Sequence, residues 1–133
     1  MDKKKAIIIE DFKLIAELWK TLLSDKNIET IKSYNNADGI ESEILELSPD
    51  IVLMDINLKG KKNGLQLTAE LIKSNPNIKI LVLTIHKDKN YILKAKKAGT
   101  RGYLTKNSSV ADFNTAIDTV LNDEFYFDAI SAN

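Results

Sequence analysis

Five polar side chains that could do chemistry stand directly after short apolar runs in the sequence. Glu10 and Asp11 follow AIII, Asp55 follows IVLM, Thr84 ends LVLT and Lys106 follows GYLT. A carboxylate beside a buried apolar segment is costly unless a ligand or a partner needs its charge. Clustered carboxylates favour a hard divalent cation such as Mg²⁺, and an ammonium group suits a phosphate oxygen. These residue types predict a site where a metal ion and a phosphoryl group meet.

The position of Asp55 between a predicted cation and Lys106 indicates a nucleophile. A carboxylate in such a place can attack phosphorus and form an aspartyl-phosphate. The hydroxyl of Thr84 could hydrogen-bond the same group. We therefore predict that Asp55 accepts a phosphoryl group.

The runs that position these residues alternate with stretches in which apolar residues recur at helical spacing. The predicted strands cover residues 6–9, 28–34, 50–54, 78–84 and 101–105. The predicted helices have their apolar stripes within residues 12–23, 37–47, 65–72, 91–98 and 110–121. Their predicted N-caps, where the pattern offers one, are Asn63, Asp88 and Ser108 or Ser109.

Apolar strands that alternate with helices predict an α/β fold with a parallel sheet covered on both faces. The expected fold is a flavodoxin-like (βα)5 doubly wound sheet with strand order 2-1-3-4-5. In this order the first, third, fourth and fifth strands lie side by side. Their carboxyl ends, and the polar residues that follow them, would share one crevice.

Composition excludes several classes of protein. The 133 residues suit one domain, and 19 basic against 19 acidic residues give no net charge, which argues against a nucleic-acid-binding domain. The absence of cysteine excludes disulfides and thiolate metal sites. No apolar run approaches the roughly 20 residues of a membrane span. We expect a cytoplasmic domain without a membrane partner.

In these motifs the sequence resembles the receiver domain of two-component response regulators. The resemblance rests on Glu10-Asp11, on Asp55 in LMDINL, on Thr84 in LVLTIH and on Lys106 in GTRGYLTK, and it spans residues 5–122. The stretches LTIHKD and AGTRGYLTKNSS are most similar to the NarL/LuxR subfamily. The resemblance implies a receiver domain over residues 1–124. Residues 125–133 would be a C-terminal tail or the start of a linker to an output domain outside this chain.

The resemblance also implies a ligand set for the metal. Asp11 would hold Mg²⁺ directly and Glu10 through water. Asp55 would bind it as well, and the backbone carbonyl of Asn57 would complete the set.

The remaining implied roles concern the switch and its partners. A sensor histidine kinase or a phosphotransfer protein would phosphorylate Asp55, Lys106 would pair with the phosphoryl group, and Tyr103 would turn inward as Thr84 moves toward it. A homodimer on activation is possible, and DNA would be bound only through a domain absent from this chain. The domain would phosphorylate and dephosphorylate itself without being a turnover enzyme, and its output would be transcription regulation.

Three local features depart from the pattern of the family. The loop INLKGKKNG after Asp55 is one residue longer than usual and lacks a proline, which predicts a more mobile loop. Asn107 replaces the proline that often follows the lysine, which leaves open whether the Lys106–Asn107 bond is cis or trans. His86 lies beside the expected path of hydrolytic water, where with Asn57 it would tune the phosphoryl lifetime.

Other interpretations stay open. Asp11 alone could be the N-cap of the first helix. An enzyme of the haloacid dehalogenase type also uses an aspartyl-phosphate, but needs a second acid where this chain has Asn57. A stand-alone or phosphate-independent receiver, acting by protein contact, is the third alternative.

Overall fold

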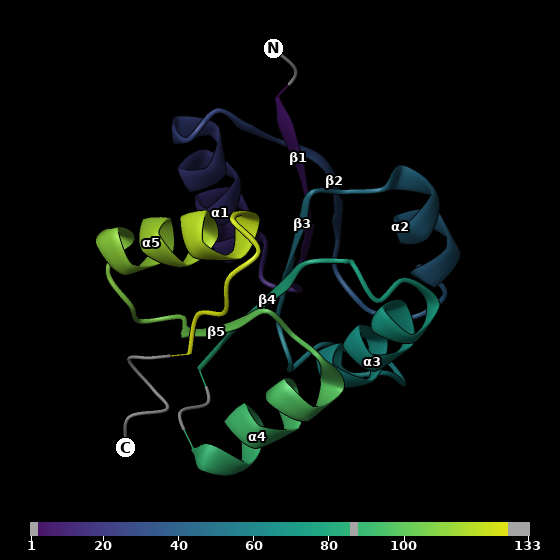
Figure 1. Cartoon of the computed structure of the whole chain (residues 1–133). Coiled ribbons are helices and arrows are strands. Elements are labelled where there is room, and N and C mark those ends of the chain that lie inside the picture. Colours follow the sequence, from purple (N-terminus) through teal and green to yellow (C-terminus); the bar gives the residue numbers. More distant parts are fainter. Residues whose placement is uncertain (1–2, 86–87, 128–133) are drawn as a thin grey trace.

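The computed structural model describes residues 3–85 and 88–127, which form one parallel sheet with helices on both faces (Figure 1). The sheet has the order β2-β1-β3-β4-β5, as predicted. Its strands are β1 (Lys4–Ile9), β2 (Ile28–Tyr34), β3 (Ile51–Met54), β4 (Ile80–Thr84) and β5 (Gly102–Thr105). The helices are α1 (Lys13–Asp25), α2 (Glu41–Leu47), α3 (Gly64–Ser74), α4 (Lys89–Ala98) and α5 (Val110–Leu121).

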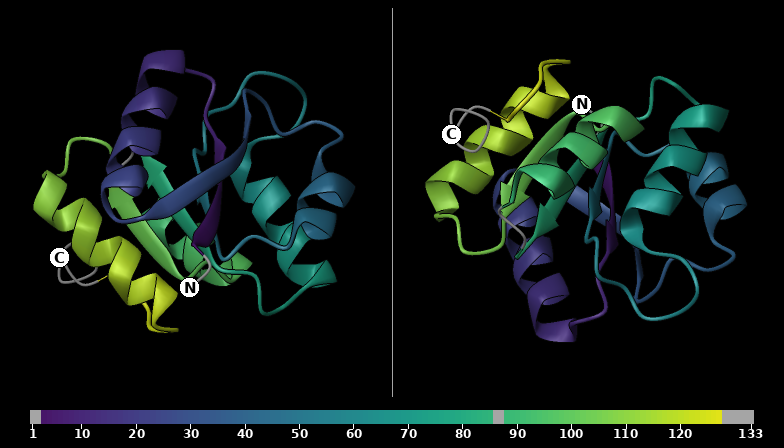
Figure 2. Two further views of the ribbon diagram at one scale, coloured as in Figure 1. Left: turned by 90° about the horizontal axis from the view of Figure 1, so that it is seen from above. Right: turned by 90° about the horizontal axis from the view of Figure 1, so that it is seen from below.

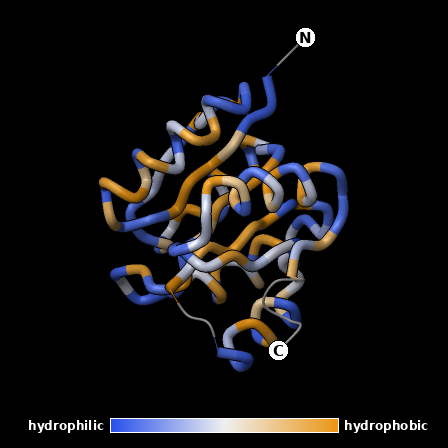
Figure 3. The backbone as a smooth tube through the Cα atoms, turned by 90° about the vertical axis from the view of Figure 1, so that its left-hand side faces the viewer, coloured by the Kyte–Doolittle hydropathy of each residue, from blue (hydrophilic) through white to orange (hydrophobic). Residues whose placement is uncertain are grey.

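The sheet separates two layers of helices, α1 and α5 on one face and α2, α3 and α4 on the other (Figure 2). Successive side chains of a strand point to opposite faces, so Ile8 packs with Trp19 and Phe113 whereas Ile7 packs with Leu67. Figure 3 shows hydrophobic segments running through the centre and hydrophilic ones around them. The strands are buried on both sides, which explains their continuous apolar sequence.

Side-chain caps fix where three helices begin. Asn63, Asp88 and Ser109 each accept a hydrogen bond from the backbone N–H three residues further on, so these N-cap predictions are confirmed. Asn63 also takes part in a reciprocal capping box with Gln66. Gly99 ends α4 with φ of 97°, a left-handed conformation that glycine adopts without strain. The loops that follow β3, β4 and β5 therefore end where the sequence indicates.

The start of α1 differs from the prediction. Its N-cap is Phe12, which is 66% exposed and does not belong to the buried stripe, and Asp11 is not the cap. The backbone N–H of Phe12 instead donates to Glu10 Oε2 at 3.0 Å. The described peptide bonds are all trans, so the Lys106–Asn107 bond is trans. Within the described ranges, no helix has both the length and the apolar character that a membrane span requires.

Candidate functional site

The three predicted acids meet at the carboxyl ends of two neighbouring strands. β1 ends at Ile9 and β3 at Met54, and these two residues are paired in the sheet. One carboxylate oxygen from each of Glu10, Asp11 and Asp55 lies within 4.8 Å of the other two. Glu10 and Asp55 are each 2% exposed, and Asp11 is half-buried. The cluster expected from the sheet topology is therefore present.

Lys106 projects into this cluster from the end of β5. Its Nζ lies 2.5 Å from Glu10 Oε1 and 3.2 Å from Asp55 Oδ2. Its backbone N–H donates to the carbonyl of Thr84 at 2.8 Å, which ties it to the end of β4. The ammonium also lies 5.8 Å from the ring centroid of Trp19 on α1. These contacts aim Lys106 at Asp55 although no proline follows it.

Burial sets the electrostatics of the cluster. Burial raises the pKa of Glu10 from 4.5 to about 7, against the lowering effect of Lys106 and of the Phe12 N–H. Burial also raises the pKa of Asp55, against Lys106 and a hydrogen bond from the Asn57 backbone. Burial alone would lower the pKa of Lys106, but its bond to Glu10 and the charge of Asp55 outweigh that effect and raise it.

The donor set fits a divalent metal ion. When all three carboxylates are ionised, as a bound cation favours, they exceed the one ammonium by two negative charges in a largely buried place. Hard oxygen donors of this kind suit Mg²⁺. Asp11 and Asn57 line one cleft of about 510 Å³ beside the cluster. The other residues that line this cleft are Phe12, Leu14, Ile15, Asp55, Ile85 and Lys106. The carbonyl of Asn57 as a ligand stays a prediction.

The metal-free protein is expected to lose stability as the pH rises from about 5 to about 8. Glu10 keeps its proton in the fold up to a pKa of about 7, whereas its ordinary pKa is 4.5. This retained proton stabilises the folded state fully below the ordinary pKa of 4.5. The stabilisation is lost as the pH rises through the pKa of about 7 that Glu10 has in the folded protein. Urea unfolding in EDTA should show a fall of roughly 1–2 kcal/mol in the free energy of unfolding.

Glu10→Gln is the matched control for this pH dependence, because it keeps the shape of the side chain and removes its titration. The free energy of unfolding of Glu10→Gln should change less between pH values of about 5 and about 8 than that of the wild type. Saturating Mg²⁺ should stabilise the wild type more at the higher of these pH values. An equal slope in wild type and variant would contradict the assignment to Glu10.

Thr84 and Tyr103 are buried and do not line the cleft. Thr84 is fully buried at the end of β4, where it pairs with Thr105 of β5. Tyr103 is also fully buried and packs with Val82 and other residues between β5 and α4. Tyr103 thus has the inward position already, and its movement together with Thr84 stays a prediction. His86 lies outside the described residues.

Gly64, the last residue of the motif INLKGKKNG, positions the backbone next to Asp55. Its N–H donates to the carbonyl of Ile56 at 2.9 Å, which closes the base of the loop 57–63. A Cβ at this position would lie 1.8 Å from the carbonyl oxygen of Asp55. One feature of the sequence points to this role: Gly64 is the first residue of a helix although glycine has a low helix propensity. A glycine at such a position indicates that a side chain there would meet a neighbouring group.

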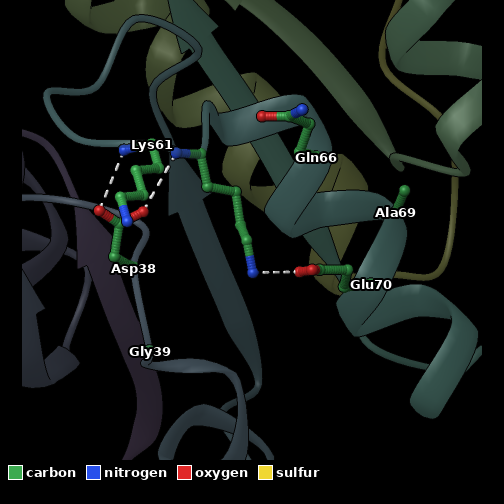
Figure 4. Close-up of a pocket in the computed structure, with 7 residues that line it drawn as sticks. Asp38, Gly39, Lys61, Gln66, Ala69 and Glu70 are labelled. Carbon is green, nitrogen blue, oxygen red and sulfur yellow. Dashed lines mark hydrogen bonds and ion pairs between the residues drawn. The ribbon is translucent and has the colours of Figure 1, made fainter.

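Asp38 holds the tip of the same loop (Figure 4). Its Oδ2 accepts from the Lys61 N–H and its Oδ1 from the Lys62 N–H, both at 3.1 Å. The Lys62 side chain forms an ion pair with Glu70 of α3. The cleft of about 720 Å³ in this view is lined by these residues and by Gly39, Gln66 and Ala69, and not by the acid cluster. The mobility expected of the loop stays a prediction, but its tip is anchored.

Comparison with curated proteins finds relatives of about twice this length. The transcriptional regulatory protein DegU of Brevibacillus brevis is 32% identical over 120 residues, which are 90% of this chain and 50% of DegU. The oxygen regulatory protein NreC of Staphylococcus epidermidis is 31% identical over 127 residues, 93% of this chain and 57% of NreC. This chain thus spans about half the length of these relatives.

Solved structures show the same likeness. A LuxR-family two-component response regulator from an Aurantimonas species has a TM-score of 0.87 and 26% identity, covering 94% of this chain and 89% of that one. A LuxR-family DNA-binding response regulator from Staphylococcus aureus has a TM-score of 0.81 and 28% identity, covering 90% and 99%. Residues 6–118 match the family described as response regulator receiver domain. With its acid cluster and lysine at the carboxyl edge of a 2-1-3-4-5 sheet, the chain belongs to the response regulator receiver domain family.

Proposed function

We propose that this receiver is a switch controlled by phosphorylation of Asp55. The observation that carries the proposal is the 3.2 Å contact between Lys106 Nζ and Asp55 Oδ2 inside the buried acid cluster. The phosphoryl donor would be a phosphohistidine of a sensor histidine kinase or of a phosphotransfer protein. Glu10, Asp11, Asp55 and the carbonyl of Asn57 would hold Mg²⁺.

The chemistry follows from the positions of the side chains. An oxygen of Asp55 forms a bond to phosphorus while the bond from phosphorus to the donor nitrogen breaks, and the donor imidazole keeps that electron pair. Lys106, shared here by Glu10 and Asp55, would turn its Nζ to a phosphoryl oxygen and balance its charge. Mg²⁺, when bound, supplies further positive charge for the phosphoryl oxygens. Thr84 would hydrogen-bond a third oxygen.

We infer the output from the relatives. DegU is a transcriptional regulatory protein, and a related solved structure is a DNA-binding response regulator. The whole protein would accordingly regulate transcription in the cytoplasm, through a DNA-binding domain outside this sequence. The receiver would act by changing its contacts, including homodimer contacts, and not by turnover of a substrate.

Acetyl phosphate with Mg²⁺ is expected to give a slow band of the purified protein in phosphate-affinity electrophoresis. EDTA should remove the band, because the carboxylates then lack the cation that offsets their repulsion. Trp19 gives a second readout, since it is the sole tryptophan and lies 5.8 Å from the Lys106 ammonium, so its fluorescence should change on phosphorylation. No band and no fluorescence change from folded protein would contradict the proposal.

A further inference from the structure

Residues 122–127, which follow α5, return to the sheet, and Tyr126 lies along the outer edge of β5. The N–H of Tyr103 donates to the carbonyl of Tyr126 at 3.0 Å, and the N–H of Tyr126 donates to the carbonyl of Arg101 at 3.0 Å. β5 is the last strand of the sheet, so this edge would otherwise present unpaired backbone groups. Figure 1 shows the segment, in yellow, beside β5. We call residues 125–127 the C-terminal strap.

The turn before the strap is held by charged contacts. Asp123 has φ of 65°, and its carboxylate lies 2.9 Å from an Arg101 guanidinium nitrogen and 3.6 Å from Lys79 Nζ. The Arg101 guanidinium in turn lies 5.5 Å from the ring centroid of Phe125. A Cβ on Gly102 would lie 3.3 Å from the Tyr126 carbonyl oxygen, so the missing side chain leaves room for the strap. Asp123, Arg101 and Gly102 thus form the site at which the strap docks.

The last aromatic residue of the strap reaches the core. Phe127 is 8% exposed, whereas Phe125 is 65% exposed. Lys96 of α4 places its Nζ 4.9 Å from the centroid of the Phe127 ring. Phe127 belongs to a buried cluster, the Tyr103 cluster, whose members are Ile56, Val82, Ile92, Ala95, Tyr103 and Phe127.

The Tyr103 cluster is connected to the acid site in two ways. Ile56 follows Asp55 directly and is 1% exposed within the cluster. Tyr103 and Lys106 are carried by the end of the same short strand, and Lys106 contacts Asp55. One packed cluster and one short strand thus join Asp55 to the strap, which offers a physical route for coupling between them.

We propose that the β5 edge is a docking surface for the C-terminal strap and that docking of the strap is coupled to phosphorylation of Asp55 through Tyr103. This inference rests on the proposed function. In the structure Tyr103 and Phe127 are both buried and belong to the same cluster. A phosphoryl group that fixes Lys106 also fixes the end of β5, and so favours the docked strap. Thermodynamic reciprocity then requires the docked strap to strengthen binding at Asp55 by the same factor.

Amide hydrogen exchange, measured residue by residue by NMR, tests this coupling. The Tyr103 N–H is bonded to Tyr126, so its exchange rate reports undocking of the strap. Beryllofluoride with Mg²⁺ serves as the phosphoryl stand-in, and its binding is followed by Trp19 fluorescence and by fluorine NMR. We expect it to slow exchange of the Tyr103 amide by about tenfold.

Two phenylalanine variants of the strap separate coupling from general effects. Phe127→Ala should speed exchange of the Tyr103 amide. It should also weaken the binding of beryllofluoride. The factor of weakening should equal the factor by which beryllofluoride slows exchange in the wild type. Phe125→Ala removes an exposed ring whose recorded contact is with the Arg101 guanidinium, so it should change both quantities much less than Phe127→Ala does. Phe127→Leu replaces Phe127→Ala if the latter does not fold, and should give the same two changes at smaller size.

The possible outcomes are distinguishable. If beryllofluoride binds and the Tyr103 amide exchanges at an unchanged rate, the coupling is overturned and the function proposed for Asp55 stands. Equal effects of Phe125→Ala and Phe127→Ala would also overturn it. If neither beryllofluoride nor acetyl phosphate acts on the wild type, the proposed function fails and the coupling fails with it.

Discussion

Asp55→Asn is expected to abolish the slow band that acetyl phosphate and Mg²⁺ produce. An amide is not a nucleophile toward phosphorus under these conditions, and it also removes one of the charges that would hold the metal. The shape of the side chain is nearly kept, and a buried carboxylate with a raised pKa is removed, so the variant should fold at least as stably as the wild type. Circular dichroism and urea unfolding of the same preparation establish this.

Asp50→Asn is the control for this loss. Asp50 precedes β3 at the opposite end from Asp55, and its Oδ2 accepts the N–H of Lys5 at 2.7 Å. This variant should keep the band in full. A band that depends on Mg²⁺ in Asp55→Asn would show that another side chain, with Glu10 and Asp11 as the candidates in the cluster, accepts the phosphoryl group.

Gly64→Ala is expected to lower the free energy of unfolding by about 3 kcal/mol, the upper end of the usual cost of overpacking. The added Cβ would lie 1.8 Å from the Asp55 carbonyl oxygen and 3.0 Å from the Ile56 Cα, both backbone atoms that cannot turn away. Relief requires the start of α3 or the end of β3 to shift, which moves Asp55 relative to Lys106. Urea unfolding measures the first effect, and the rate at which the phosphorylated band appears measures the second.

Gly39→Ala provides the comparison at a glycine without a steric neighbour. Gly39 has φ of +70° and nothing within 4 Å of its missing Cβ, so alanine there should cost about 1 kcal/mol through backbone strain. It should leave the phosphorylation rate unchanged. Equal losses of stability in the two variants would mean that the contact with Asp55 is relieved at little cost.

The sequence carries most of the fold because the local signals agree. Strands buried on both faces must be apolar throughout, and such runs, with caps at Asn63 and Asp88, leave few alternatives for the topology. The site follows from the same argument, since parallel order brings the residues after β1, β3 and β5 to one edge. Glu10, Asp55 and Lys106 meet there as predicted.

The remaining features depend on contacts between distant segments, which periodicity does not encode. The exposure of Phe12 was not predicted because the apolar spacing of α1 extends to the residue before its first helical residue, Lys13. The contact of Gly64 with Asp55 arises when a loop closes on its own base. The burial of Phe127 depends on a left-handed turn at Asp123 that brings the chain back to β5. The domain boundary at residue 124 stays a prediction, although Phe127 packs on the body of the domain.

The loop between β3 and α3 has a further consequence for the engineering of this receiver. Its base is closed by the bond from Gly64 to Ile56, and Asp38 holds Lys61 and Lys62 at its tip. Residues inserted after Gly60 would therefore lengthen a surface loop whose two ends are fixed, at a loop-entropy cost of about 0.6 kcal/mol for each doubling of length. We expect that a reporter peptide or a new recognition segment inserted there leaves the geometry of Asp55, the proposed phosphorylation site, unchanged.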